Sequence, residues 1–260
     1  MRLADRVALV TGGGSGIGRA ACLALAQEGA RIGVLGLTEE SVNRVAEEID
    51  RAGGWALPLT ADISQPEQIQ SAIETLARRW SRLDIIFANA GINGVWAPLE
   101  DLTPQDWDQT LNINLKGTFL TIKYAAPYLK RQGGSIIITS SVNGTRVFSN
   151  IGATAYSCSK AGQVALAKML ALELARDGIR VNVICPGSIE TPIDEKTERR
   201  GLEDLPKQAE FPQGKVPLTG GQPGRPEQVA DLVVFLASDA AGHISGTEIW
   251  IDGAESLLVG

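Results

Sequence analysis

The stretch VALVTGGGSGIG, residues 7–18, decides how this chain is expected to fold. Its first four residues form a short apolar run typical of a buried strand, and a glycine-rich turn follows and leads into a helix-like segment. Such a turn lets backbone N–H groups and the positive end of the helix approach a pyrophosphate closely. In this strand-to-helix context the spacing of Gly12, Gly16 and Gly18 predicts a dinucleotide-binding turn, whereas the glycines alone would indicate only a flexible loop.

Short apolar runs alternate with helix-like segments along the rest of the chain. The alternation predicts βαβ units and an α/β fold: a single-domain, doubly wound parallel β-sheet with helices on both faces. The one long irregular region, residues 186–226, is typical of a functional loop or lid. The expected strands cover residues 7–10, 31–35, 55–60, 83–88, 135–139, 179–184 and 248–251, and the expected helices cover 19–29, 39–52, 65–80, 104–131 in two pieces, 155–176 and 226–238.

Composition excludes several classes of protein. The chain has 260 residues, 44% of them hydrophobic, and a net charge of −6, which argues against a nucleic-acid or anionic-membrane partner. No apolar run reaches the length of about 18 residues that a membrane span needs, and the first residues leave no room for a signal peptide, so we expect a cytoplasmic protein. Three scattered cysteines and a single histidine, His243, make a metal site or a Ser-His-Asp triad unexpected.

Tyr156 and Lys160 form a candidate acid/base pair. They lie four residues apart in the Ala/Leu-rich segment 155–176, so on a helix they share a face. A positive charge beside a phenol favours the phenolate and lowers its pKa, which would bring the hydroxyl closer to useful proton exchange at neutral pH. For the pair alone, an ordinary aromatic–cation contact on a helix surface is the simpler interpretation.

Six motifs then occur in the order seen in short-chain dehydrogenases/reductases, and the resemblance covers essentially the whole chain. It implies one Rossmann-like, NAD(P)-binding catalytic domain over residues 1–260 that transfers a hydride between nicotinamide and a ketone or secondary alcohol. The motifs are TGGGSGIG at 11–18, Asn89-Ala90-Gly91, Asn114, Ser140-Ser141, Tyr156 with Lys160, and Pro186-Gly187.

The resemblance also implies catalytic roles. Tyr156 would be the general acid/base, and Lys160 would lower its pKa and hold the nicotinamide ribose. Ser141 would hydrogen-bond the substrate oxygen. Asn114 would hold a water that links Lys160 to solvent, with Asn112 as a nearby competitor for that role.

Cofactor contacts follow from the same resemblance. Some of these positions also have a local interpretation: Asn89 could tie strand ends together, and Thr191 could be a loop-capping residue. The resemblance assigns cofactor contacts to Gly12, Ser15, Gly16, Ile17, Gly18, Gly36, Leu37, Asp62, Ile63, Asn89, Ala90, Gly91, Tyr156, Lys160, Pro186, Gly187, Ile189 and Thr191.

Two features depart from the family pattern. The end of the second strand carries Gly36 and Leu37, neither the acidic residue that selects NAD nor a following arginine that favours NADP. Glu39 and Glu40 lie close by and would oppose a 2′-phosphate, so the prediction leans slightly towards NAD(H), with dual use open.

The second departure is the segment between Ser141 and Tyr156, which is about two residues longer than the family spacing. Asn143 stands at the usual spacing from Tyr156, so it competes with Ser141 for the serine role. Arg146 could bind an anionic substrate group, or could be a solvated loop arginine, and Trp96 is expected to shape the substrate pocket.

Two classes of function remain open at this point. The favoured hypothesis is an NAD(P)-dependent carbonyl reductase or alcohol dehydrogenase, with 3-oxoacyl-carrier-protein reduction as the alternative substrate assignment. The other class is a dinucleotide-binding sensor without chemistry, which would have no need for the serine, tyrosine and lysine together. The resemblance further implies a homotetramer that acts on a small carbonyl or alcohol substrate.

Overall fold

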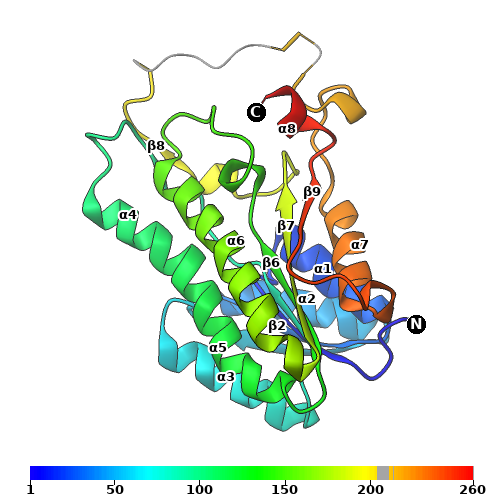
Figure 1. The fold of residues 1–260 in the computed structure, drawn as a ribbon. Coiled ribbons are helices and arrows are strands. Elements are labelled where there is room, and N and C mark those ends of the chain that lie inside the picture. Colours follow the sequence, from blue (N-terminus) through cyan, green and yellow to red (C-terminus); the bar gives the residue numbers. More distant parts are fainter. Residues whose placement is uncertain (204–210, 213, 260) are drawn as a thin grey trace.

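A seven-stranded parallel sheet forms the centre of the chain, as the alternation of apolar runs predicts (Figure 1). The computed structural model describes residues 1–203, 211–212 and 214–259. The strands are arranged in the order β3-β2-β1-β4-β6-β7-β9. They are β1 (Val7–Thr11), β2 (Arg31–Gly36), β3 (Trp55–Thr60), β4 (Ile85–Ala88), β6 (Gly134–Thr139), β7 (Ile179–Pro186) and β9 (Glu248–Ile251).

The strand order reverses between β1 and β4. The chain runs outward from β1 through β2 to β3, then returns and runs outward on the other side from β4. In sheets of this kind, the crevice beyond the carboxyl ends of the strands at such a reversal is where ligands bind. The glycine-rich turn after β1 lies at this point.

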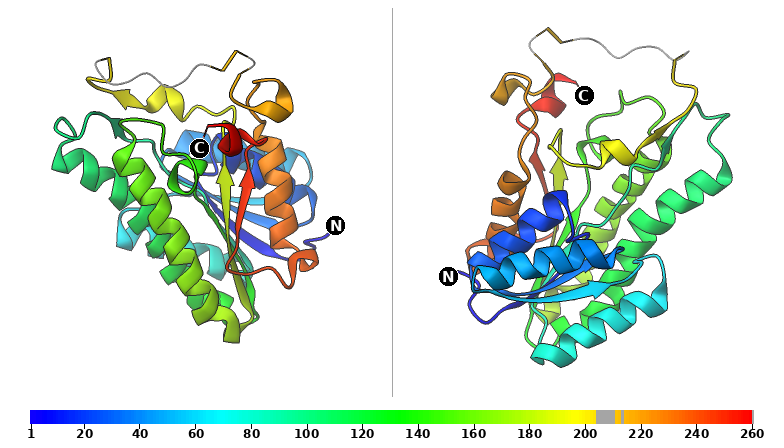
Figure 2. Two further views of the ribbon diagram at one scale, coloured as in Figure 1. Left: turned by 45° about the horizontal axis from the view of Figure 1, so that its top comes forward. Right: turned by 180° about the vertical axis from the view of Figure 1, so that it is seen from behind.

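Helices cover both faces of the sheet, so the predicted fold class is confirmed. Alternate residues of β1 serve two separate cores: Val7 and Leu9 pack with α3, α5 and α6, whereas Ala8 and Val10 pack with α1, α2 and α7. Figure 1 has α5 and α6 in front, and the reverse view in Figure 2 brings α1 and α2 forward. The helices are α1 (Gly16–Gln27), α2 (Glu39–Arg51), α3 (Pro66–Trp80), α4 (Pro104–Leu111), α5 (Gly117–Leu129), α6 (Thr154–Leu174), α7 (Pro226–Ala237) and α8 (Glu255–Leu258).

Several helix boundaries follow from local chemistry. Proline stands in the first turn of α3, α4 and α7, where its missing N–H would have no helical partner. Thr103 caps α4 through a reciprocal box with Asp106. None of the described helices is long and apolar enough to cross a membrane.

The structure refines two sequence predictions and adds elements that the sequence did not predict. The helix expected in two pieces over 104–131 is α4 and α5 joined without a break by a π-helical turn, Asn112–Lys116. The region 186–226 contains short elements, among them β8 (Glu198–Arg199), which pairs in parallel with β5 (Val95–Trp96). Within that region, residues 204–210 and 213 lie outside the described residues. The small β5–β8 sheet and α8 had no signal in the sequence, because both are short and depend on distant partners.

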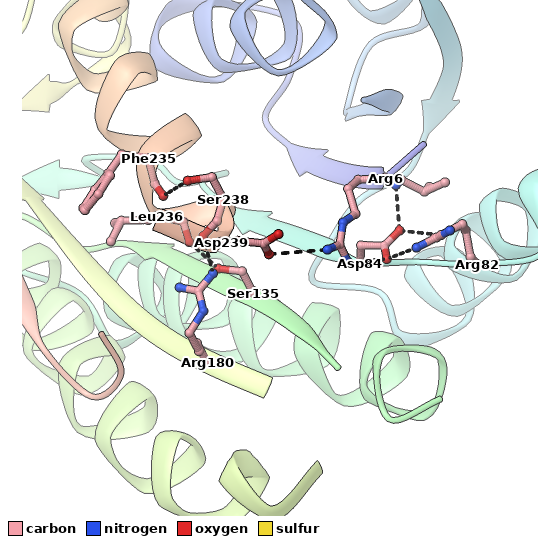
Figure 3. Close-up of polar contacts among 10 residues, drawn as sticks. Arg6, Arg82, Asp84, Ser135, Arg180, Phe235, Leu236, Ser238 and Asp239 are labelled. Atoms are coloured by element: carbon pink, nitrogen blue, oxygen red, sulfur yellow. Dashed lines mark hydrogen bonds and ion pairs between the residues drawn. The ribbon is translucent and has the colours of Figure 1, made fainter. Parts of the chain in front are cut away.

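A polar network closes the edge of the sheet at which the strands begin (Figure 3). The carboxylate of Asp84 is 1% exposed; it accepts from the backbone N–H of Val7 at 2.8 Å and from Arg82 at 2.6 and 2.9 Å. Arg6 bridges Asp84 and Asp239, with both N–O distances 3.4 Å. This network ties β1, β4 and the end of α7 together on the side away from the glycine-rich turn.

Candidate active site

A cavity of about 670 Å³ lies at the carboxyl ends of the strands. Its walls come from segments far apart in the sequence: the glycine-rich turn, residues 89–93 after β4, residues 139–143 after β6, the start of α6, and residues 186–196 after β7. Because these segments all follow strands of one parallel sheet, the fold gathers them at a single edge. A dinucleotide and a small substrate would both have to fit here.

Tyr156, Lys160 and Ser141 meet in this cavity. Helix α6 begins at Thr154, so Tyr156 stands in its first turn and Lys160 one turn later. Both side chains are buried, and the Lys160 Nζ lies 5.5 Å from the centroid of the Tyr156 ring. The side chain of Ser141 lies close enough to that of Tyr156 to lower the pKa of the phenol, and both residues line the cavity. The serine at the longer spacing therefore interacts with the tyrosine.

The pKa of Tyr156 differs from the value that the sequence predicts. Burial raises the pKa to about 12 and outweighs the nearby hydroxyl of Ser141, which lowers it; the charge of Asp194 raises it further. Burial also lowers the pKa of Lys160 to about 8, and its Nζ donates to the Thr139 carbonyl oxygen at 2.9 Å. The predicted lowering of the Tyr156 pKa by Lys160 is wrong for this arrangement, because desolvation is the larger effect. A protonated Tyr156 is suited to donate a proton.

Asn114 lies in the π-helical turn and is fully buried. Its Oδ1 accepts from the Ile92 N–H at 2.9 Å, and its Nδ2 donates to the Ile92 carbonyl oxygen at 2.9 Å and to Ser159 Oγ at 3.0 Å. Asn112, its competitor, is exposed. The side chain of Asn114 thus fixes the wall segment after β4 against α6, one residue before Lys160. π-Helical turns are frequent at functional sites.

The glycine-rich turn has the shape that a pyrophosphate requires. Gly12 and Gly16 have φ of +68° and +49°, which side chains disfavour, and a Cβ on Gly18 would lie 2.1 Å from the Gly12 carbonyl oxygen. The backbone N–H of Asn89 donates to Thr11 Oγ1 at 3.0 Å, and its Nδ2 donates to the Thr11 carbonyl oxygen at 3.2 Å. Asn89 therefore ties β4 to β1, as the local interpretation expected, and the turn at the start of α1 is held open.

The predicted cofactor and substrate residues divide into two groups. Those that line the cavity are Gly12, Ser15, Gly16, Ile17, Asn89, Ala90, Gly91, Trp96, Ser141, Asn143, Tyr156, Lys160, Pro186, Gly187, Ile189 and Thr191. Those outside its lining are Gly18, Gly36, Leu37, Asp62, Ile63, Asn114 and Arg146.

The end of β2 carries no carboxylate that could select NAD. A Cβ on Gly36 would lie 2.8 Å from Val42 Cγ1, so α2 fills the space into which a larger side chain would extend. Leu37 is 70% exposed. The carboxylate of Asp62 accepts from the N–H and the hydroxyl of Ser64 at 2.8 and 2.7 Å, which makes it part of a local turn after β3.

Arg146 does not line the cavity, so the structure does not support its contact with an anionic substrate; its side chain is exposed, as the loop-arginine interpretation expected. Its guanidinium carbon lies 3.6 Å from the centroid of the Trp250 ring, and its Nη1 lies 3.5 Å from Ser256 Oγ. Trp250 Nε1 donates to Thr145 Oγ1 at 3.0 Å. The longer segment after Ser141 folds back onto the C-terminal residues, so Arg146 joins two parts of the chain instead of facing a substrate.

Sequence reasoning missed a carboxylate in the cavity wall, that of Glu255. It accepts from the backbone N–H of Ser188 at 2.6 Å, directly after the Pro186-Gly187 motif, and burial raises its pKa. Asn93, also missed, donates to Asp194 Oδ1 at 3.2 Å and to Thr197 Oγ1 at 2.7 Å, and so holds part of the 186–226 region against the wall. No local pattern marks either residue, because each acts on a segment at least 67 positions away.

Comparison with known proteins places this site in context. Residues 12–254 match a family model described as enoyl-(acyl carrier protein) reductase. The chain is 39% identical to the 3-oxoacyl-[acyl-carrier-protein] reductase of Thermotoga maritima over 97% of this chain and 98% of the relative. A crystal structure of a 3-ketoacyl-ACP reductase from Sinorhizobium meliloti is 53% identical, with a TM-score of 0.94, over 97% of this chain and 99% of that one. A reductase from Brucella melitensis complexed with NADH is 28% identical, with a TM-score of 0.86, over 98% and 99%.

Proposed function

The chain belongs to the short-chain dehydrogenase/reductase family and is an NAD(P)-dependent oxidoreductase, and from this premise we propose that it reduces the 3-oxo group of a 3-oxoacyl thioester. The observation that carries the proposal is that Ser141, Tyr156 and Lys160 line one cavity together with the glycine-rich turn. The choice of a thioester is supported by the similarity to the two acyl-carrier-protein reductases.

Each of three side chains, those of Tyr156, Ser141 and Lys160, has its own role in the reduction. Tyr156, which is protonated at neutral pH and whose pKa burial raises to about 12, donates its proton to the substrate oxygen as the carbonyl is reduced. The backbone N–H of Asn143 donates to Ser141 Oγ at 3.1 Å, which leaves the serine proton available for the same substrate oxygen. Lys160 presents a cation beside the ring and, through Thr139, is anchored to the end of β6. The alcohol product gains this proton and one hydride.

The cofactor fits the same cavity. The cradle formed by Gly12, Gly16 and Gly18 has no room for a side chain and would hold the pyrophosphate at the start of α1. When bound, reduced nicotinamide supplies the hydride. Its ring would lie against residues 186–189, next to Tyr156, and the described part of the region 186–226, which lines the cavity at Thr191 and Ile193, would cover the substrate.

NAD(H) is the cofactor that we favour, with dual use still open. Gly36 leaves no cation at the end of β2, and Glu39 and Glu40 in the first turn of α2 would repel a 2′-phosphate. Separate titrations with NADH and NADPH test this choice. Binding of NADPH at least as tight as that of NADH contradicts it.

The alternative class, a dinucleotide-binding sensor without chemistry, would retain the glycine-rich turn and lose the need for Ser141 and Tyr156. A homotetramer in the cytoplasm is part of the proposal and rests on the family resemblance. Light scattering tests the assembly, and a mass equal to that of one chain contradicts it.

The decisive experiment is an assay with acetoacetyl-CoA and each reduced cofactor. We expect loss of reduced-nicotinamide absorbance and formation of the 3-hydroxyacyl thioester. Turnover of simple ketones without turnover of acetoacetyl-CoA would overturn the thioester assignment and leave the oxidoreductase class intact.

A further inference from the structure

The C-terminal segment, residues 250–259, is anchored to the loop that follows β6. The guanidinium of Arg146 stacks on the ring of Trp250, and the hydroxyl of Ser149 donates to the Val259 carbonyl oxygen at 3.2 Å. These two contacts lie at the start and at the end of the segment, so both of its ends are tied to the loop that carries Ser141. Glu255 stands between them in the chain and is part of the cavity wall.

A tight turn fixes the position of Glu255. The two carboxylate oxygens of Asp252 accept from the backbone N–H groups of Ala254 at 3.1 Å and Ser256 at 3.0 Å, and its carbonyl oxygen accepts from the N–H of Glu255 at 2.9 Å. Arg146 Nη1 lies 3.5 Å from Ser256 Oγ. Because the backbone is held on both sides of Glu255, the point from which its side chain extends is fixed.

The carboxylate of Glu255 contacts the loop that follows β7. Its Oε2 accepts from the backbone N–H of Ser188 at 2.6 Å. A Cβ on Gly187 would meet the same oxygen, so the absence of a side chain at this position lets the carboxylate approach the backbone. A hydrogen bond to a charged acceptor is stronger than one between neutral groups. Gly187 and Ser188 both line the cavity, so this bond acts directly on its wall.

The other contacts of this loop are made by backbone groups. The N–H of Gly187 donates to the Ile251 carbonyl oxygen at 3.2 Å, and the Ser188 carbonyl oxygen accepts from the N–H of Gly224 at 2.9 Å. Glu255 supplies its contact through a side chain. A substitution at Glu255 can therefore remove one support of the loop and leave the backbone contacts in place.

We propose that Glu255 is a positioning residue for the nicotinamide end of the cofactor: by holding the N–H of Ser188, its carboxylate fixes residues 187–189 in the conformation against which the nicotinamide ring lies. The inference rests on the proposed function, which places the ring against this loop. The glycine-rich turn at the pyrophosphate is fixed by other elements, since Asn89 Nδ2 donates to Thr11 and Arg44 Nη2 donates to Gly14. Separate contacts thus hold the two ends of the cofactor site.

The test compares the whole cofactor with the part of it that lacks nicotinamide. The reduced cofactor that the titrations above favour is paired with ADP-ribose for NADH, or with the 2′-phosphate of ADP-ribose for NADPH. Dissociation constants are measured by isothermal titration calorimetry on the full-length protein, and urea unfolding checks that each variant is folded.

Three substitutions separate the hydrogen bond from the charge. Glu255→Ala removes the carboxylate. Glu255→Asp keeps the charge but withdraws it from Ser188 by one methylene group, whereas Glu255→Gln keeps the length of the side chain and an oxygen acceptor without the charge. Glu190→Ala, at an exposed glutamate of the same loop outside the cavity lining, is the control.

We expect Glu255→Ala and Glu255→Asp to weaken binding of the reduced cofactor by about 3- to 10-fold, the effect of losing one hydrogen bond to a partly exposed charged group. Binding of the fragment without nicotinamide should change by less than about 2-fold, because the glycine-rich turn keeps its own supports. Glu255→Gln should stay within about 2-fold of the unmodified protein for both ligands, since its oxygen still accepts from Ser188. The control should match the unmodified protein.

Equal weakening of the cofactor and the fragment would show a general loosening of the site and overturn the positioning role. Unchanged cofactor binding in Glu255→Ala would overturn it too. A loss in Glu255→Gln as large as that in Glu255→Ala would assign the effect to charge and overturn the hydrogen bond as its cause. The comparison needs no substrate, so failure of acetoacetyl-CoA turnover, which contradicts the thioester assignment, is read separately.

Discussion

The two ends of the central sheet treat buried polar groups in opposite ways. Where the strands begin, Asp84 is satisfied entirely within the chain, by the N–H of Val7 and by the guanidinium groups of Arg82 and Arg6 (Figure 3). Where the strands end, Tyr156 and Lys160 are buried without an opposite charge, so burial raises the pKa of the phenol and lowers that of the ammonium group. Burial with a charged partner holds a fold together, whereas burial of an ionisable group without one is typical of a site for a ligand.

Arg180 breaks this pattern, and its position explains why. Its Nη2 donates to the Ser238 carbonyl oxygen at 3.2 Å at the closed end of the sheet, while its Nη1 is buried without a partner. Burial lowers its pKa. No cavity of the size of the active site adjoins it among the described residues, so we assign it to the packing of β7 against the end of α7.

The comparison predicts that substitutions at the carboxyl ends of the strands change activity, and that those at the beginning change stability. The largest effect is expected for Tyr156→Phe. Removal of the proton donor should lower kcat by about 10²- to 10⁴-fold, the usual contribution of a positioned acid. The dissociation constant for the reduced cofactor and the urea midpoint should change little, since the ring remains.

Tyr128→Phe is the matched control for this substitution. Tyr128 lies on α5 under the guanidinium of Arg131, 5.0 Å from the ring centroid, and it does not line the cavity. We expect full turnover for the control. A Tyr156→Phe enzyme that retains more than about a tenth of the turnover would contradict the acid role.

Asp84→Ala tests the polar network at the edge of the sheet where the strands begin. It leaves the buried N–H of Val7 and two guanidinium groups without their acceptor, and should lower the free energy of unfolding by about 3 kcal/mol. Urea unfolding followed by circular dichroism measures this loss. Turnover per folded molecule should remain unchanged.

Asp239→Ala removes the other carboxylate that Arg6 contacts and serves as the control. That carboxylate is 94% exposed, so its loss should change the free energy of unfolding by less than about 0.5 kcal/mol. Equal effects of the two substitutions would show that the network at this end contributes through surface charge alone.

Lys160→Met tests how much the buried ammonium group at the carboxyl ends of the strands destabilises the fold. Burial lowers the pKa of Lys160 from 10.5 to about 8, which disfavours the folded state wherever the unfolded chain holds the proton. The penalty is complete below pH 8 and disappears as pH rises towards 10.5. Removal of this penalty is partly offset by loss of the hydrogen bond to Thr139, so the substitution should stabilise the protein by about 2 kcal/mol at pH 7. It should also abolish most turnover.

The pH dependence is the sharper measurement. The gain in stability of Lys160→Met over the unmodified protein should shrink as unfolding is measured at pH values from 8 towards 10.5. Lys168→Met, at a side chain 55% exposed on the same helix, should show no such trend. A gain that grows with pH would contradict the buried-ammonium argument.

Features that depend on neighbouring residues could be predicted from the sequence, whereas features that depend on distant contacts could not. The strands and helices were predictable because periodicity and glycine turns act over a few residues. The family resemblance, in spite of the longer segment before Tyr156, assigned Ser141, Tyr156 and Lys160 to one site, and all three line the same cavity. The contact between Arg146 and Trp250 could not be predicted, because the two residues are 104 positions apart and nothing local marks the pair. The pKa of Tyr156 was misread because desolvation depends on packing that no local pattern contains.

Ala254→Gly should have the smallest effect. It asks whether strain near the active-site cavity lowers stability and, at the same time, supports cofactor binding. Ala254 has φ of +69°, a left-handed conformation that costs a residue with a Cβ about 1 kcal/mol, and it immediately precedes Glu255, whose carboxylate holds the N–H of Ser188. Glycine relieves this strain but gives the unfolded chain more freedom, so the net gain should be about 0.5 kcal/mol.

Ala24→Gly, inside α1, should instead destabilise the protein by at least about 1 kcal/mol, because glycine there loses helix propensity and a methyl group that packs against the core. If the strain at Ala254 holds Glu255 against the loop beside the nicotinamide, the stabilised Ala254→Gly protein should bind reduced cofactor more weakly, by up to about 2-fold. Stabilisation with unchanged cofactor binding would mean that the left-handed conformation of Ala254 shapes only the turn after β9 and does not contribute to cofactor binding. Destabilisation would mean that the strain argument itself is wrong at this position.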